Sequence, residues 1–167
     1  MVQILPGVAL IKDYMIFKIN PKKLASRVKL DISQGDNLLH VWARSPRGDV
    51  GYIRGSISKD WLCLCDLKVY DDAYVSYPFA NNLLVDLFGP YKKLNFRGLG
   101  IGSRLLRAFI DAARKLGIRE IWGSVQDGDT KQTPHLLDFY KKHGFSITEP
   151  DDECMDIAKW KIVMKLP

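Results

Sequence analysis

An amphipathic helix that directly follows three alternating glycines is the feature that constrains this sequence most. Over residues 102–116 the apolar side chains recur with the 3.6-residue period of an α-helix, and Gly117 provides a stop signal. The apolar face consists of Leu105, Leu106, Phe109, Ile110, Ala113 and Leu116. A helix with such a face must pack on a second layer, and the flanking β-forming segments predict that this layer is a sheet.

Before the helix, two segments rich in β-forming residues predict a hairpin. Residues 38–44 and 50–58 flank the sequence SPRGD, which has the chemistry of a turn. Further upstream, residues 15–20 predict a short strand, and residues 22–29 predict one or two helical turns.

Residues 61–70, WLCLCDLKVY, predict the central strand of the sheet. They are apolar at nearly every position up to Asp66, so we expect this strand to be buried on both faces. Cys63 and Cys65 would then share one face about 6.6 Å apart, which is poor geometry for a disulfide. We expect both to be reduced core residues. With Cys154 the chain has an odd number of cysteines and no C-x-x-C pair, so neither a disulfide framework nor a metal site is predicted.

After the helix the pattern alternates between strands and a second helix. Residues 118–125 predict a strand, residues 134–142 a helix, and residues 159–166 a final strand, with one more strand after Phe145. The order of elements predicts an α/β (α+β) protein with a mainly antiparallel sheet and helices on its faces.

The length of 167 residues favours one domain, 1–167, that buries its own core. Residues 71–96, between the central strand and the glycines, read as an insertion in which residues 79–88 have helical spacing.

Charge and hydropathy narrow the classes of partner. The net charge of +6 suggests a polyanionic partner, but the basic residues are dispersed and no nucleic-acid module is recognisable, so nucleic acid is not expected. No apolar run reaches the ~18 residues of a membrane span, and the N-terminus has no basic region of a signal peptide. We therefore expect a cytoplasmic protein without a membrane partner.

The glycine segment itself suits an anion. Gly98, Gly100 and Gly102 lack Cβ atoms, so several backbone N–H groups can face a pyrophosphate at the positive end of the helix dipole. The G-x-G-x-G spacing does not fit the dinucleotide motif, and no Gly-Lys-Ser/Thr is present for a P-loop. For the glycines alone, a turn without a ligand is the alternative.

Two motifs in the right order resemble the GNAT superfamily of N-acetyltransferases. Arg97, Gly100 and Gly102 match the signature Arg/Gln-x-x-Gly-x-Gly/Ala, and the later segment FYKKHGF resembles the family's helix end with a tyrosine followed by Gly-Phe. The resemblance covers roughly residues 36–166. One departure is Thr133, where many members have an asparagine seven residues before the tyrosine.

The resemblance implies a GNAT-like sheet in which acetyl-CoA, the co-substrate, binds between two splayed parallel strands, residues 61–70 and 119–125. Tyr140 would protonate the leaving thiolate, although an interfacial tyrosine with its hydroxyl in water is the alternative. The implied cofactor contacts are the backbone of Leu67, Lys68 and Val69 for the pantetheine and the amides of Arg97, Gly98, Leu99, Gly100, Ile101, Gly102 and Ser103 for the pyrophosphate.

The acceptor of such a transfer would be a primary amine, and the amine must lose a proton. An alkyl amine with a pKa near 10.4 is neutral in only about one molecule in two thousand at pH 7, roughly 4.6 kcal/mol of penalty. Asp66 is the first candidate base, and Asp71 and Asp72 are substitutes; for each, a solvated or salt-bridged carboxylate is the alternative.

These residues predict direct transfer of acetyl from acetyl-CoA to the amine of a small molecule or protein, without a covalent enzyme intermediate, because neither motif contains a cysteine. The insertion is expected to close over the acceptor side. A CoA-binding regulatory or nucleic-acid-binding module with the same fold and no catalysis is the alternative, and a homodimer remains open.

Overall fold

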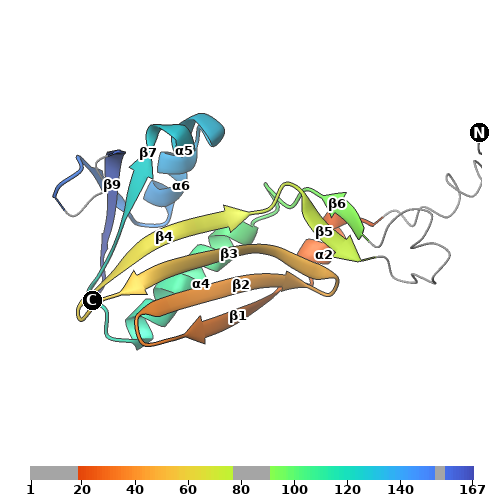
Figure 1. Cartoon of the computed structure of the whole chain (residues 1–167), viewed down its shortest axis with the longest axis horizontal. Coiled ribbons are helices and arrows are strands. Elements are labelled where there is room, and N and C mark those ends of the chain that lie inside the picture. Colours follow the sequence, from red (N-terminus) through yellow and green to blue (C-terminus); the bar gives the residue numbers. More distant parts are fainter. Residues whose placement is uncertain (1–18, 77–90, 153–156) are drawn as a thin grey trace, which may run out of the picture.

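A seven-stranded sheet is the centre of the structure, a computed structural model that describes residues 19–76, 91–152 and 157–167 (Figure 1). Neighbouring strands are antiparallel, except that β4 and β7 are parallel. This mixed, mainly antiparallel sheet confirms the predicted fold class. In sheet order the strands are β1 (Lys29–Gln34), β2 (Leu38–Ser45), β3 (Gly48–Ile57), β4 (Trp61–Val69), β7 (Glu120–Gln126), β9 (Ala158–Lys165) and β8 (Ser146–Thr148).

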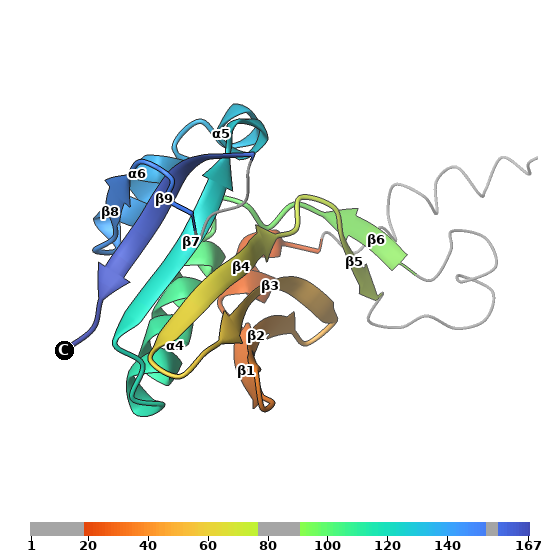
Figure 2. The same ribbon diagram turned by 60° about the vertical axis from the view of Figure 1, so that its left-hand side comes forward.

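The predicted amphipathic helix is α4 (Ile101–Lys115), and it packs on β2, β3 and β4 (Figures 1 and 2). Its side chains Leu105, Leu106 and Phe109 are fully buried in the core. Burying each such side chain stabilises the fold by about 1.5–3 kcal/mol. The buried face therefore requires apolar residues at helical spacing, and this spacing predicted the helix. The described part of the chain has three shorter helices: α2 (Pro21–Ala25), α5 (Asp127–Gln132) and α6 (Leu136–Lys142).

The parallel strands β4 and β7 diverge from one end. Their backbone pairing is confined to Trp61 with Glu120, Leu62 with Ile121 and Cys63 with Trp122. Beyond these residues the two strands run apart, as both views show (Figures 1 and 2). On the side that faces β7, the edge of β4 therefore has no strand partner in the described chain from residue 64 to residue 69. The predicted splayed pair is confirmed.

Gly123 lies where the strands last approach each other. A Cβ atom on this residue would lie 2.9 Å from the carbonyl oxygen of Leu64, closer than real Cβ atoms come to backbone. The base of the splayed pair thus requires glycine on β7.

We expect Gly123→Ala to lower the free energy of unfolding by about 1–3 kcal/mol, since the added methyl group forces the strands apart. Chemical denaturation measures this change. The matched control is Gly128→Ala, because a Cβ atom there would meet nothing within 4 Å. Equal stability of the two variants would contradict the close approach.

A β-bulge interrupts the pairing of β4 with β3. Arg54 pairs with Asp66 and Gly55 with Leu64, so Cys65 has no opposite residue on β3. The prediction that this strand is buried on both faces was wrong, because α4 covers one face while Cys65 is exposed on the strand. The expectation that Cys63 and Cys65 are core residues was wrong too. Cys63 is half-buried and Cys65 is exposed, because both alternate along β4 with the buried residues Leu62 and Leu64.

The front of the chain differs most from the prediction. The expected helix over residues 22–29 is shortened to α2, which Asn20 caps by accepting hydrogen bonds from the N–H groups of Lys22 and Lys23 at 2.9 and 3.4 Å. The expected strand over residues 15–20 lies mostly outside the described residues. Strand β1 was not predicted, because it is an edge strand with mostly exposed side chains and has little apolar alternation.

The two ends of the expected insertion form a separate two-stranded sheet. Strand β5 (Ala73–Ser76) pairs antiparallel with β6 (Tyr91–Leu94), beyond the far end of β4 (Figure 1). After β6 the chain comes back to the end of β4. There Phe96 is buried, and its N–H donates to the carbonyl of Tyr70 at 3.0 Å. The helix expected over residues 79–88 lies outside the described residues.

Candidate active site

The splayed strands enclose a cleft of about 340 Å³. It contains five of the residues predicted for the site, from three separate parts of the chain. They are Asp66, Leu67 and Lys68 on β4, Arg97 before α4, and Tyr140 on α6. Its other lining residues are Tyr52, Leu64, Cys65, Ser124, Val125, Asp129, Gln132, Thr133, Leu136 and Ile162.

The glycine loop has the geometry of an anion site. Gly98 and Gly100 have positive φ angles of 74° and 77°, a region that L side chains rarely adopt. Gly100 is the N-cap of α4, which has no side-chain cap and no acidic residue in its first turn. The first N–H groups of a helix have no intrahelical partner, so these amides and the helix dipole can bind an anion. Gly102 lies between the end of β4 and α6, since a Cβ atom on it would lie 3.6 Å from the side chain of Val69 and 3.7 Å from that of Phe139.

Arg97 fixes this loop to the end of β4. Its Nε donates to the carbonyl of Val69 at 3.4 Å, and its guanidinium lies 3.7 Å from the carboxylate of Asp71. The N–H of Arg97 donates to the side chain of Asn95 at 2.8 Å. The amides that can meet an anion therefore begin after Arg97, whose side chain lines the cleft.

Tyr140 reaches the cleft from α6 with only 5% of its surface exposed. Its ring is held between Phe139 and Phe145, with centroid distances of 5.4 and 5.5 Å. Burial, with smaller contributions from Asp129 and Asp66, raises the pKa of its hydroxyl above the usual value. The hydroxyl is therefore protonated at neutral pH and can act as a proton donor.

Asp66 lines the cleft within a hydrogen-bonded group. The hydroxyl of Tyr52 donates to its carboxylate at 2.5 Å, and the guanidinium of Arg54 lies 3.8 Å away. The hydrogen bond to Asp66 is the largest cause that raises the pKa of Tyr52 to about 12. The substitute bases Asp71 and Asp72 instead pair with Arg97 and with Lys93, and neither lines the cleft.

An aromatic cluster continues from Tyr52 across the sheet. His40 lies against Trp42 with ring centroids 4.3 Å apart, Trp42 lies 5.3 Å from Tyr52, and Tyr52 lies 6.2 Å from Tyr70. The Nε2 atom of His40 is buried without a partner among the described residues. Burial, helped by the charge of Arg54, lowers its pKa. The cluster had no sequence motif that could have revealed it.

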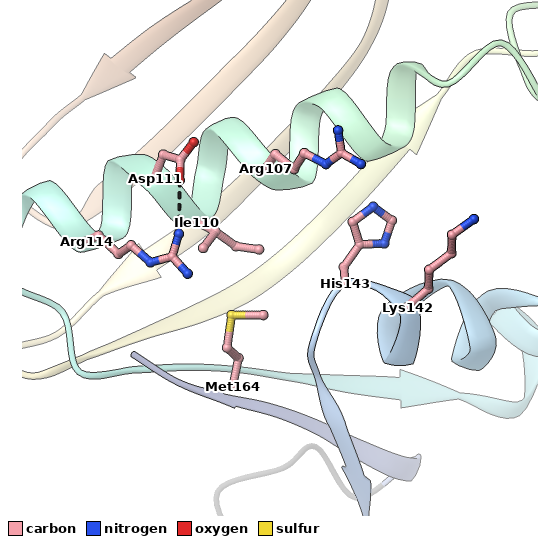
Figure 3. A pocket seen from close by; sticks show the side chains of 7 residues that line it. All are labelled: Arg107, Ile110, Asp111, Arg114, Lys142, His143 and Met164. Carbon is pink, nitrogen blue, oxygen red and sulfur yellow. Dashed lines mark hydrogen bonds and ion pairs between the residues drawn. The ribbon is translucent and has the colours of Figure 1, made fainter. Parts of the chain in front are cut away.

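A second hollow, of about 390 Å³, lies between α4 and the end of α6 (Figure 3). Its side chains are mostly basic, and Arg114 is paired with Asp111 at 3.1 Å. The ring of His143 is fixed by its Nδ1 atom, 2.8 Å from the carbonyl oxygen of Phe139. The residues around this hollow are Arg107, Ile110, Asp111, Arg114, Lys142, His143 and Met164.

Within the described part of the chain, no helix combines the length and the apolar composition needed to cross a membrane. The same residues include no group of three or more His, Cys, Asp or Glu side chains placed to hold a metal ion.

Comparison with known proteins supports the family resemblance over part of the chain. Residues 88–147 match the family model described as an acetyltransferase (GNAT) domain. A search of curated protein sequences gives no match.

Several solved structures have the same fold. The PaiA N-acetyltransferase of Thermoplasma acidophilum, in complex with coenzyme A, aligns with a TM-score of 0.52 and 19% identity over 78% of this chain and 62% of that chain. A GNAT family acetyltransferase of Elizabethkingia anophelis with acetyl-CoA bound gives a TM-score of 0.55 and 13% identity, over 84% of this chain and 99% of that one. Arabidopsis thaliana Naa50, in complex with the bisubstrate analogue CoA-Ac-MVNAL, gives a TM-score of 0.51 and 22% identity over 76% and 72%.

The family model over residues 88–147 and the fold of the solved structures agree with the two motifs, so this chain is similar to GNAT acetyltransferases. The family resemblance drawn from the sequence is confirmed.

Proposed function

We propose that this protein transfers an acetyl group from acetyl-CoA directly to a primary amine. The observation that carries the proposal is the cleft between β4 and β7, which is lined by Arg97 of the uncapped glycine loop and by the largely buried residue Tyr140. An acyl donor with a long, phosphate-bearing carrier fits both features.

The cofactor lies along β4 in this proposal. Its pyrophosphate meets the amides of the loop from Gly98 to Ser103, and its pantetheine arm pairs with the unpaired edge of β4 at Leu67, Lys68 and Val69. The basic hollow of Figure 3 offers cations to a further phosphate group of coenzyme A, since Arg107 lies seven residues, or about 10 Å, along α4 from Gly100.

The transfer needs two proton movements. The neutral amine attacks the thioester carbonyl, the new C–N bond forms, and the C–S bond breaks to release coenzyme A as a thiolate. Tyr140 donates its proton to this sulfur, and Asp66 accepts the proton that the amine loses. The support for Asp66 over Asp71 and Asp72 is its place in the cleft.

Tyr52 positions Asp66 in this scheme, and Tyr52→Phe removes the hydrogen bond that the Tyr52 hydroxyl donates to the carboxylate of Asp66. A hydrogen bond to a charged group contributes about 1.5–3 kcal/mol, so we expect kcat/KM for the amine to fall by about 10- to 150-fold. The Kd for acetyl-CoA should not change. Steady-state kinetics and calorimetry measure the two quantities, and Tyr70→Phe is the control because it keeps the aromatic cluster and leaves Asp66 bonded. An equal loss in both variants would remove Tyr52 as a positioning residue.

The whole proposal is tested by titrating the protein with coenzyme A and then following thiol release from acetyl-CoA. The amine panel contains polyamines, aminoglycosides, amino acids and peptides with a free N-terminus. Release with at least one amine is expected. Binding without release from any amine would favour the CoA-binding module instead.

Three expectations from the sequence remain proposals: one domain with an insertion over residues 71–96, a cytoplasmic location, and a homodimer. Limited proteolysis tests the first, cell fractionation the second and analytical ultracentrifugation the third.

A further inference from the structure

We infer that Cys65 is a second acyl acceptor, which takes the acyl group from bound acyl-CoA when no amine is present and holds it as a thioester. The inference rests on the proposed function, because the acyl donor is the cofactor of that function. It adds a modification site on the enzyme itself.

Cys65 lies on β4, along which the proposed function places the cofactor. Its side chain is exposed and lines the same cleft as Asp66 and Tyr140. With a rise of ~3.3 Å per residue, Cys65 lies ~13 Å along β4 from Val69, where the glycine loop meets the strand. A carrier arm that is anchored at the loop and extended along β4 therefore brings its reactive end toward Cys65.

The hydroxyl of Tyr140 independently indicates that the cleft receives a ligand. Only 5% of the residue surface is exposed, and no described residue forms a hydrogen bond with the hydroxyl. Its oxygen is not among the buried atoms without a partner, so the hydroxyl opens on the cleft that Tyr140 lines and can bond a polar group there. A thioester in the cleft would supply such a group next to the strand that carries Cys65.

The surroundings of Cys65 favour its thiolate form. Hydrogen bonding with Cys63 is the largest cause that lowers the pKa of Cys65 to about 6, and the N–H of Ser56 and the charge of Arg54 act in the same direction. Burial and the carboxylate of Asp66 oppose this shift. A lowered pKa makes the nucleophilic thiolate more available near neutral pH, although the thiol also donates to the carbonyl of Cys63 at 3.5 Å.

The transfer is balanced without any further reactant. The Cys65 thiolate attacks the acyl carbonyl, a new S–C bond forms, and the S–C bond to coenzyme A breaks. Coenzyme A leaves as a thiolate and takes a proton from Tyr140, and no atom is oxidised or reduced. Transfer to an amine stays direct in this scheme, and Cys65 takes the acyl group only when no amine is present.

The experiment incubates the full chain with acetyl-CoA and no amine and follows the intact mass. We expect one added acetyl group that peptide mapping places on Cys65 and that neutral hydroxylamine removes, since hydroxylamine cleaves thioesters but not acetyl-lysine. Alkylation of Cys65 by iodoacetamide should rise through about pH 6 and should block the label.

Two variants make the result specific. Cys65→Ser should lose the hydroxylamine-sensitive label, and Cys63→Ser should retain it at a slower rate, because Cys63 only assists the thiolate. A label that survives in Cys65→Ser overturns the inference. Binding of acetyl-CoA in calorimetry without a label on Cys65 also overturns it and leaves the proposed function standing, whereas no binding at all overturns both.

Discussion

Gly100→Asp is expected to abolish the binding of coenzyme A while the protein stays folded. The new carboxylate would stand at the uncapped start of α4, where the proposal places the pyrophosphate. Two like charges about 4 Å apart near a surface repel by about 4 kcal/mol, which raises the Kd about 10³-fold. A Cβ atom at this position meets nothing within 4 Å, so steric damage is not the cause. Isothermal titration calorimetry measures the loss.

The same helix provides a matched control at its other end. Gly117 has a φ angle of 73°, close to the 77° of Gly100, and a Cβ atom there also meets nothing within 4 Å. Gly117→Asp therefore introduces the same backbone strain and the same charge away from the cleft. We expect it to bind coenzyme A normally. If Gly100→Asp also bound normally in the folded state, the loop would not be the phosphate site.

Tyr140→Phe is expected to lower kcat by about 10²-fold or more, because general acid catalysis contributes about 10²–10⁴-fold. The ring keeps its contacts with Phe139 and Phe145, so stability and the Kd for acetyl-CoA should barely change. Steady-state kinetics with the identified amine measures kcat, and thermal unfolding verifies the fold.

A chemical control separates proton donation from packing. With a coenzyme A analogue whose thiol is more acidic, the leaving group needs less protonation, so the defect of Tyr140→Phe should shrink. A variant with nearly normal kcat would remove Tyr140 from catalysis and leave water or the amine as the proton source.

Local patterns predicted one part of this site and missed another. Helix α4, the glycine loop and Tyr140 depend on spacing within one segment, and the structure contains α4 as predicted. The hydrogen bond between Tyr52 and Asp66 joins residues 14 positions apart on two strands. It depends on the register of β3 against β4, which the composition of neither strand fixes.

The clearest error about the site concerns Cys65. An apolar run in the sequence predicted a strand with two buried faces, but burial alternates along β4, so Leu62 and Leu64 are buried while Cys65 is exposed. Helix α5 was missed because DGDTKQ has no buried residue and therefore no apolar face to detect.

The divergence of β4 and β7 also affects the solubility and stability of the protein without its cofactor. Two strand edges with unsatisfied backbone groups face the cleft in the described chain, and such edges template pairing with other molecules and aggregation. A cofactor that occupies the cleft covers these edges and binds the native state alone. At a concentration of 100 Kd it would stabilise that state by about 2.7 kcal/mol. Coenzyme A would thus protect the solubility of the enzyme as well as supply its acyl group.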